Sequence, residues 1–330
     1  MTHLLDDTRR SRPLLVTALL AALLGGVAPP LAAQKGQDAG TAQDAESSTA
    51  SVRTANEEEL EQLLDEFDAA KKEKSSRALA SALERLSAFN NPELLDCARD
   101  GFRYKASKSD KDDAEAEAEA LGMDEKDVIE RIVEMRVAEV VEQAAAVCVA
   151  IGDEDSLEML VKTLGDRKIA ESIPKVTGII DGLAKHRLAS EKADEMVLEI
   201  IAEIDQHDYA GDNFDYNDPG AQVSGYDYLG RYRAAFRYFG HRKTKSLETV
   251  LLIAKHLHAP APGFVDSPDN PPADYWRARF ETWQRYNRDV VWALKQITGQ
   301  TWRPGYSDED GEGEVARQWI VEHAEKLGLE

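Results

Sequence analysis

One spacing of apolar residues recurs along most of this chain and restricts its fold more than any other feature. Four separate segments place apolar side chains at positions i, i+3, i+4 and i+7, which is the pattern of one apolar stripe on an amphipathic helix. The four sets are Leu60, Leu63, Leu64 and Phe67; Leu157, Leu160, Val161 and Leu164; Ala193, Met196, Val197 and Ile200; and Leu247, Val250, Leu251 and Ala254. No long stretch alternates apolar and polar residues as a strand would. The sequence therefore predicts an all-α protein.

Residues that favour helix ends lie where this spacing requires them. Gly152 can end one helix, and the acidic stretch after it can start the next. Ser190 is predicted to cap a helix over 191–206, and Ser246 a helix over 247–257. The predicted helices are roughly 10–17 residues long and are joined mostly by tight turns, as is typical of helical pairs.

The first 33 residues have the layout of a secretory signal peptide. Three arginines precede an apolar run over 13–28, and small residues lie just before Gln34. Glycines and prolines interrupt the run before it reaches the ~20 residues that a transmembrane helix needs. We expect cleavage near Ala33, with a retained N-terminal anchor as the alternative. After cleavage the protein is expected to have no membrane span and to be periplasmic or extracellular, with association with the envelope as a further alternative.

Composition divides the remainder into segments. Residues 34–54 are small and polar, and we interpret them as a disordered linker. Residues 55–206 are predicted to form N-terminal helical repeats. They are interrupted at 107–127 by a charge-dense insertion, which is either a solvated helix extension or disordered. Residues 207–230 are predicted to be an acidic aromatic loop, and 231–330 a tryptophan-rich helical part.

The balance of charge restricts the partners. The chain has 40 lysines and arginines against 62 aspartates and glutamates, for a net charge of −22. Such a surface repels nucleic acid and anionic membranes, because a protein binds either of them through basic residues. It favours cationic partners or divalent ions. The only two cysteines, Cys97 and Cys148, lie among apolar neighbours. They are interpreted as two buried thiols, with a disulfide between them as the alternative.

Two stretches resemble HEAT repeats, the units of armadillo-type α-solenoids. The first is AIGDEDSLEMLVKTLGD (150–166), with leucines between two Gly-Asp turns. The second is WALKQITGQTW (292–302) with the segment that follows it, which is similar to the closing repeat of exported bacterial HEAT-repeat proteins. The residues that carry this second likeness are Ala293, Leu294, Thr298, Gly299 and Trp319.

The resemblance implies an irregular array of helix pairs, an α-α superhelix that acts as a scaffold or binding surface. No clean repeat of ~40–47 residues can be laid over 56–330, because the insertion at 107–127 and the loop at 207–230 interrupt it. An irregular array is therefore expected rather than a regular one.

The acidic aromatic loop is the predicted recognition element. Aromatic side chains could supply rigid contact area, and aspartates a polar rim. The candidate partner-binding residues are Tyr209, Asp212, Phe214, Asp215, Tyr216, Tyr226 and Tyr228. One alternative is a Ca²⁺ site of non-standard geometry, which no motif supports because the EF-hand spacing is absent. The other is a long connection without a ligand.

The sequence contains no motif that indicates catalysis. GEGEVA (311–316) matches a dinucleotide-binding pattern, but no strand precedes it and its two glutamates would repel a pyrophosphate. Five tryptophans lie late in the chain and form either a core or a sugar-stacking surface: Trp276, Trp283, Trp292, Trp302 and Trp319. We predict no catalytic residue, cofactor or metal. The predicted function is that of a non-catalytic, exported scaffold or protein-binding module whose partner is another protein or an envelope component. The alternative is a carbohydrate-processing or metal-dependent envelope enzyme.

Overall fold

The computed structural model describes residues 43–123, 125–204, 227–259, 273–305 and 311–330. The chain divides into two units, residues 1–50 and 51–330, and the packing below is that of the second unit. In the described residues the regular structure is helical, and an isolated bridge between His258 and Gly305 is the extended pairing found there. The prediction of an all-α protein is confirmed.

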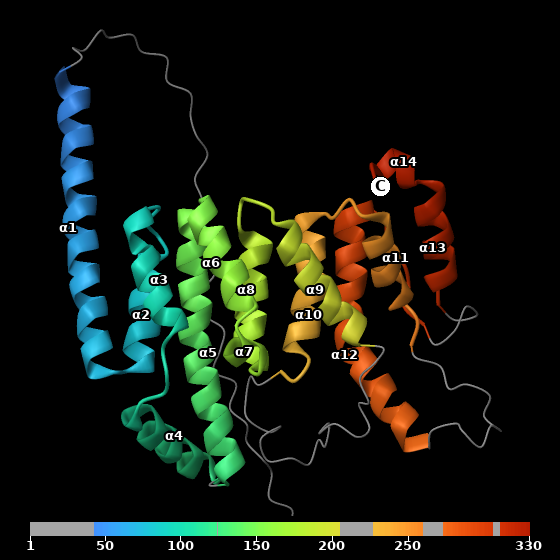
Figure 1. Ribbon diagram of the computed structural model, residues 1–330, viewed down its shortest axis with the longest axis horizontal. Coiled ribbons are helices and arrows are strands. Elements are labelled where there is room, and N and C mark those ends of the chain that lie inside the picture. Colours follow the sequence, from blue (N-terminus) through green and yellow to red (C-terminus); the bar gives the residue numbers. More distant parts are fainter. Residues whose placement is uncertain (1–42, 124, 205–226, 260–272, 306–310) are drawn as a thin grey trace, which may run out of the picture. The chain divides into compact units, whose positions relative to one another are not determined.

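The helices are short, with α1, α5 and α12 as longer members (Figure 1). Their bounds are α1 (Gln43–Glu73), α2 (Ser76–Leu86), the 3₁₀ helix η1 (Pro92–Leu94), α3 (Leu95–Phe102), α4 (Lys108–Leu121), α5 (Lys126–Ile151), α6 (Glu154–Leu164), α7 (Arg167–Ala170), α8 (Ile173–Lys185), α9 (Glu191–Glu203), α10 (Gly230–Arg242), α11 (Leu247–Lys255), α12 (Ala273–Thr298), α13 (Gly313–Glu322) and α14 (Ala324–Leu327).

Five helices form a first row in which each packs on the next: α2 on α5, α5 on α8, α8 on α10, and α10 on α12. They begin at residues 76, 126, 173, 230 and 273, so the intervals are 50, 47, 57 and 43 residues. The longest intervals are those that contain α4 and the segment between α9 and α10. These are the two places where the sequence predicted an interruption.

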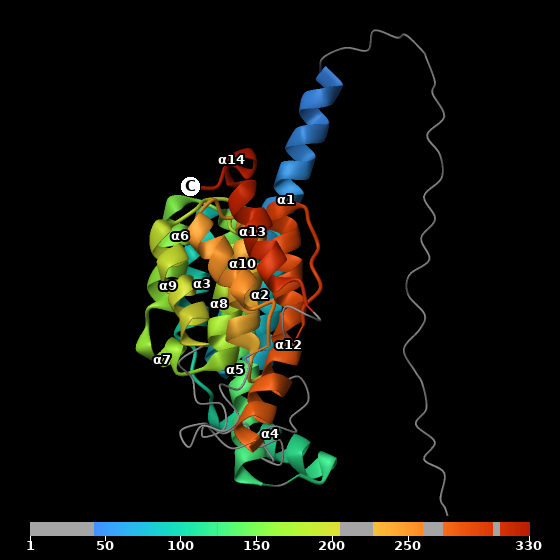
Figure 2. The same ribbon diagram turned by 90° about the vertical axis from the view of Figure 1, so that its right-hand side faces the viewer.

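A second row consists of α3, α6, α9, α11 and α13, and most of its members pack on first-row helices. Helix α3 contacts α5, α6 contacts α5 and α8, α9 contacts α10, and α11 contacts both α12 and α13. In Figure 2, α6 and α9 lie to one side of α8 and α10. One continuous apolar core runs between the two rows, from Leu63 of α1 to Leu329 after α14.

The charge-dense insertion folds as helix α4, beside the N-terminal part of α5 (Figures 1 and 2). Ser107 and Asp110 form a reciprocal capping box at its start. Ala114 and Ala118, four residues apart, pack on Val128 and Ile132 of α5 and make a small core separate from the main one. Of the two predicted states, the helical one is therefore found.

Several predicted helix ends are confirmed. Ser190 accepts a hydrogen bond from the backbone N–H of Ala193 at 3.2 Å, and Ser246 accepts one from that of Thr249 at 3.2 Å. Each satisfies one donor that the first turn leaves unpaired. Gly152 ends α5 with a left-handed φ of 67°, a conformation that side chains larger than hydrogen disfavour.

At the N-terminal side the structure differs from the predicted linker. Helix α1 begins at Gln43, inside the stretch 34–54 that was interpreted as disordered. Its alanines and glutamates favour a helix, and from Leu60 onward it carries the predicted apolar stripe, of which Leu63 and Phe67 are buried. Residues 34–42 lie outside the described residues, as does the predicted signal segment 1–33.

The two cysteines are free and buried. Cys97 on α3 and Cys148 on α5 belong to the main core. Burial raises the pKa of Cys97 to about 11 and that of Cys148 to about 12. They behave as small apolar side chains, in agreement with the first of the two predicted readings.

Candidate functional site

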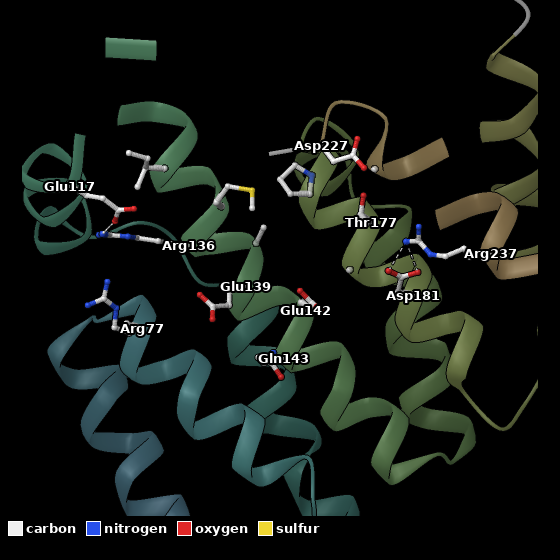
Figure 3. A pocket seen from close by; sticks show the side chains of 16 residues that line it. Arg77, Glu117, Arg136, Glu139, Glu142, Gln143, Thr177, Asp181, Asp227 and Arg237 are labelled. Atoms are coloured by element: carbon white, nitrogen blue, oxygen red, sulfur yellow. Dashed lines mark hydrogen bonds and ion pairs between the residues drawn. The ribbon is translucent and has the colours of Figure 1, made fainter. Parts of the chain in front are cut away.

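A cavity of about 630 Å³ opens along the first row of helices (Figure 3). Residues of α2, α4, α5, α8 and α10 line it, so it crosses four consecutive first-row helices. Its size is within the range of ligand-binding clefts. We call it the inner groove.

Close approach of α5 and α8 forms the floor of the inner groove. Gly178 lies opposite Glu142, where an added Cβ would meet the Glu142 Cβ at 3.1 Å. One turn further along α8, a Cβ on Gly182 would lie 2.9 Å from the Cβ of Ala145. These glycines let the two helix backbones pack closely beside the groove, which Gly178 and Glu142 both line.

Two glutamates of α5 face the groove without a hydrogen-bond or ion-pair partner among the described residues. Glu139 and Glu142 are three residues apart, so they project from one side of the helix, and Figure 3 shows both carboxylates at the cavity. Both are exposed. Within the part of the chain that the structure describes, neither makes a hydrogen bond or an ion pair. In this position they can accept hydrogen bonds from a cationic ligand.

The environment of Glu142 resists a negative charge. Neighbouring protein atoms reduce its contact with water and raise its pKa, and the charges of Asp181 and Glu139 raise it further, while Lys185 lowers it. A positively charged group in the groove would oppose the repulsion from Asp181 and Glu139 and would lower the pKa of Glu142. The ionised form of Glu142 is therefore more stable when a cation is bound in the groove than when the groove is empty.

The other acidic side chains of the groove are neutralised by arginines. Nη2 of Arg237 donates to both carboxylate oxygens of Asp181, at 3.1 and 3.0 Å. Its Nη1 lies 3.6 Å from Asp289 of α12, which also accepts from Nε of Arg233 at 2.7 Å. Nη1 of Arg233 in turn donates to Asp227 at 2.7 Å. The alternating charges join α8, α10 and α12 in one ladder.

At the α2 and α4 end the charges differ. Arg136 of α5 pairs with Glu117 of α4 at 2.6 Å and also donates to the backbone carbonyl of Asp110 at 3.1 Å. Arg77 of α2 is exposed and has no ion pair with a described residue. Among the residues that the structure describes, the inner groove thus has one cation without an ion pair at this end and two such carboxylates at its centre.

The predicted recognition loop meets the groove at its C-terminal end. Tyr209, Asp212, Phe214, Asp215, Tyr216 and Tyr226 lie outside the described residues. Tyr228 is described: it is half-buried, and the guanidinium of Arg131 on α5 lies 5.4 Å from the centre of its ring. Its neighbour Asp227 lines the groove and accepts a hydrogen bond from the backbone N–H of Leu229 at 3.0 Å.

Sequence reasoning did not single out Glu139, Glu142, Asp181 or Arg237. A signal existed for the first two, because they stand on one side of a helix whose other faces are almost wholly apolar between 137 and 151. Asp181 and Arg237 carry no comparable local signal, since their pairing depends on how α8 meets α10.

The late tryptophans form core contacts where the structure describes them. Trp283 and Trp302 are buried, and Nε1 of Trp283 donates to the backbone carbonyl of His256 at 2.9 Å. Trp302 meets Trp319 edge to face at 5.6 Å, and Trp319 stacks on His323 at 4.2 Å. Both buried tryptophans belong to the main core, which is the first of the two roles predicted for these residues. The side chain of Trp276 lies outside the described residues.

Neither a metal centre nor a membrane span is found in the described residues. There, no group of three or more His, Cys, Asp or Glu side chains is placed to hold a metal ion, and no helix is both long and apolar enough to cross a bilayer. The segment proposed as an alternative Ca²⁺ site lies largely outside this part of the chain. Comparison with protein-family models, with curated proteins and with solved structures finds no match.

Proposed function

We propose that this chain is a non-catalytic, exported binding module that holds a cationic segment of a partner protein in the inner groove. The observation that carries the proposal is the pair Glu139 and Glu142, exposed in a cavity and without an ion pair among the described residues. The neighbouring acids are already matched by arginines, so these two carboxylates are available for an external positive charge.

The architecture supports a binding role. Two rows of paired helices, with one row open along a groove, agree with the HEAT-like array that the sequence resemblance implies, and such arrays present extended surfaces to partners. The irregular intervals between first-row helices fit an irregular member of that class. Export rests on the pattern of residues 1–33 alone.

Charge supports a cationic partner. A net charge of −22 attracts positively charged proteins and speeds their encounter. Asp227, within the predicted recognition loop 207–230, lines the groove. The loop and the groove are therefore proposed to contact the same partner, with the loop supplying aromatic contacts and the groove supplying charge.

A labelled peptide tests the groove directly. The probe is a short fluorescein-labelled peptide that alternates lysine with alanine, titrated with the protein and followed by anisotropy. We expect Glu139→Gln/Glu142→Gln to weaken binding by about tenfold, since two charge-assisted hydrogen bonds are lost. The matched control is Glu195→Gln/Glu199→Gln, which removes the same charge from exposed positions of α9. Equal weakening by both pairs would reduce the effect to net charge and overturn the groove assignment.

A natural partner is sought by affinity capture from the envelope fraction. The parent is compared with the groove variant and with a chain whose residues 207–226 are replaced by a Gly/Ser linker. A protein retained by the parent and lost by both variants supports the proposal. Turnover of a polysaccharide by the parent chain would favour an enzyme instead.

A further inference from the structure

A second cavity has the opposite charge. It measures about 750 Å³ and lies between α3, α6, α7 and the start of α8. Six lysines and arginines line it against three acidic residues, Asp155, Glu158 and Asp166. The chain as a whole has 40 basic and 62 acidic residues. Basic residues therefore outnumber acidic ones in this lining, although acidic residues predominate in the whole chain. We call it the basic pocket.

Most cations of the basic pocket form no ion pair within the described part of the chain. Arg99 pairs with Asp96. The other five make no ion pair or side-chain hydrogen bond with described residues: Arg103, Lys105, Lys162, Lys168 and Lys175. Four of the five are exposed and stand at the edge of the cavity. The five cations come from four segments of the chain, namely the segment after α3 and the helices α6, α7 and α8, which distributes the positive charge around the cavity.

Lys175 is the least exposed of these five cations. It is half-buried at the start of α8. Removal of its ammonium from water lowers its pKa, and the charge of Glu134 offsets only part of this effect. A negative group in the pocket would stabilise the charged amine.

The floor of the pocket is apolar. Leu95 and Phe102 of α3, Met159 of α6 and Ile169 of α7 line it. The first three are only half-buried, so the floor is a shallow depression open to solvent. A long alkyl chain would need to be enclosed, whereas single apolar side chains of an extended peptide need only such a depression.

We propose that the basic pocket binds an acidic peptide segment whose apolar side chains rest on the floor between its carboxylates. This inference is independent of the inner groove, which is lined by different residues and takes the opposite charge. The chain would then have two separate binding sites, one for a cationic and one for an anionic segment.

The test uses the whole chain and a short fluorescein-labelled peptide that alternates glutamate with leucine. We expect Lys105→Gln/Lys162→Gln/Lys168→Gln to weaken its binding at least about tenfold, because each lost contact removes part of the electrostatic attraction. The matched control, Lys192→Gln/Lys295→Gln/Lys326→Gln, removes the same charge at exposed positions outside the pocket and should bind like the parent. Binding by the parent should also weaken as salt rises.

Two further peptides separate the contribution of charge from that of the apolar floor. A peptide with glutamine for glutamate tests the charge, and one with serine for leucine tests the floor; both should bind more weakly than the original. Phosphatidylglycerol vesicles form the third arm. The proposal is overturned if the peptide fails to bind the parent, if the pocket and control variants behave alike, or if the vesicles bind through these lysines and the peptide does not. Failure of the inner-groove variants to respond to the lysine peptide would leave this result unaffected.

Discussion

Arg237 on α10 holds Asp181 on α8 through one nitrogen that donates to both carboxylate oxygens. Both side chains are about a quarter exposed, so water screens the pair only in part. The contact bridges two first-row helices beside Glu142. It thus fixes the spacing of α8 and α10 and removes one negative charge from the inner groove.

Loss of this arginine should destabilise the fold. Arg237→Met leaves Asp181 unpaired near Glu142, and we expect the free energy of unfolding to fall by about 1–3 kcal/mol in urea titrations. The control is Arg167→Met, whose pair with Glu171 is 91% and 61% exposed and should contribute less than about 0.5 kcal/mol. Similar losses in the two variants would show that the Arg237 pair is no stronger than a surface pair.

Asp110 should make the free energy of unfolding depend on pH in the acidic range. It is buried and accepts hydrogen bonds from the Ser76 backbone N–H and hydroxyl at 3.0 and 2.6 Å, and from the Tyr104 hydroxyl at 2.5 Å. Burial alone would raise its pKa, but these bonds and one from the Ser107 backbone lower it from 3.8 to about 2. The ionised carboxylate therefore stabilises the folded state above pH 4, and this contribution disappears as the pH falls toward 2.

We expect Asp110→Asn to cost about 2 kcal/mol at neutral pH, since a pKa shift of one unit corresponds to about 1.4 kcal/mol. The difference from the parent should shrink between pH 4 and pH 2, as measured by urea titration. Asp112→Asn, at an exposed position of the same helix, is the control and should follow the parent. A difference that stays constant with pH would assign the effect to packing.

A glycine at the α10–α12 contact should resist substitution. A Cβ on Gly240 would lie 2.9 Å from Cα of Ala293, closer than real contacts allow, and would also collide with the Trp292 ring. We expect Gly240→Ala to lower stability by about 1–3 kcal/mol through overpacking. Gly165→Ala, where the nearest atom is the Met196 methyl at 3.4 Å, should be nearly neutral. Comparable melting temperatures for the two variants would contradict this close contact.

The cysteines should be unreactive until the protein unfolds. With pKa values of about 11 and 12 and little exposure, Cys97 and Cys148 hold few thiolates at pH 8. We expect no reaction of native, non-reduced protein with a thiol-specific disulfide reagent, and two equivalents in urea. Absence of reaction in urea would instead show that the two cysteines pair.

The helices could be predicted well because the features that specify them, apolar spacing and capping residues, lie within or next to each helix. The apolar stripe of 157–164 became α6, with Leu160, Val161 and Leu164 buried, and the serine caps at 190 and 246 lie where they were expected. The insertion at 107–127 could not be decided from its charge. A capping box and two alanines one turn apart, Ala114 and Ala118, made it a helix.

The inner groove could not be predicted in the same way. Arg237 and Asp181 are 56 residues apart in the sequence, as are Arg233 and Asp289. Nothing in the spacing of charges along one helix reveals a partner on another, because the choice depends on which helix packs beside it. The predicted recognition residues other than Tyr228 lie outside the described residues and stay predictions.

Helix α5 is longer than its neighbour α6 by more than two turns. Its additional turns pack against α4 and form with it a small core that is separate from the main one. The polar contacts between α4 and the rest of the fold include the hydrogen bonds that Asp110 accepts from Ser76 and Tyr104. Protonation of one carboxyl group therefore weakens the junction while leaving the larger core untouched. As the pH falls from 4 toward 2, α4 should separate first, as its own cooperative unit, and amide hydrogen exchange would show that step before the main unfolding transition.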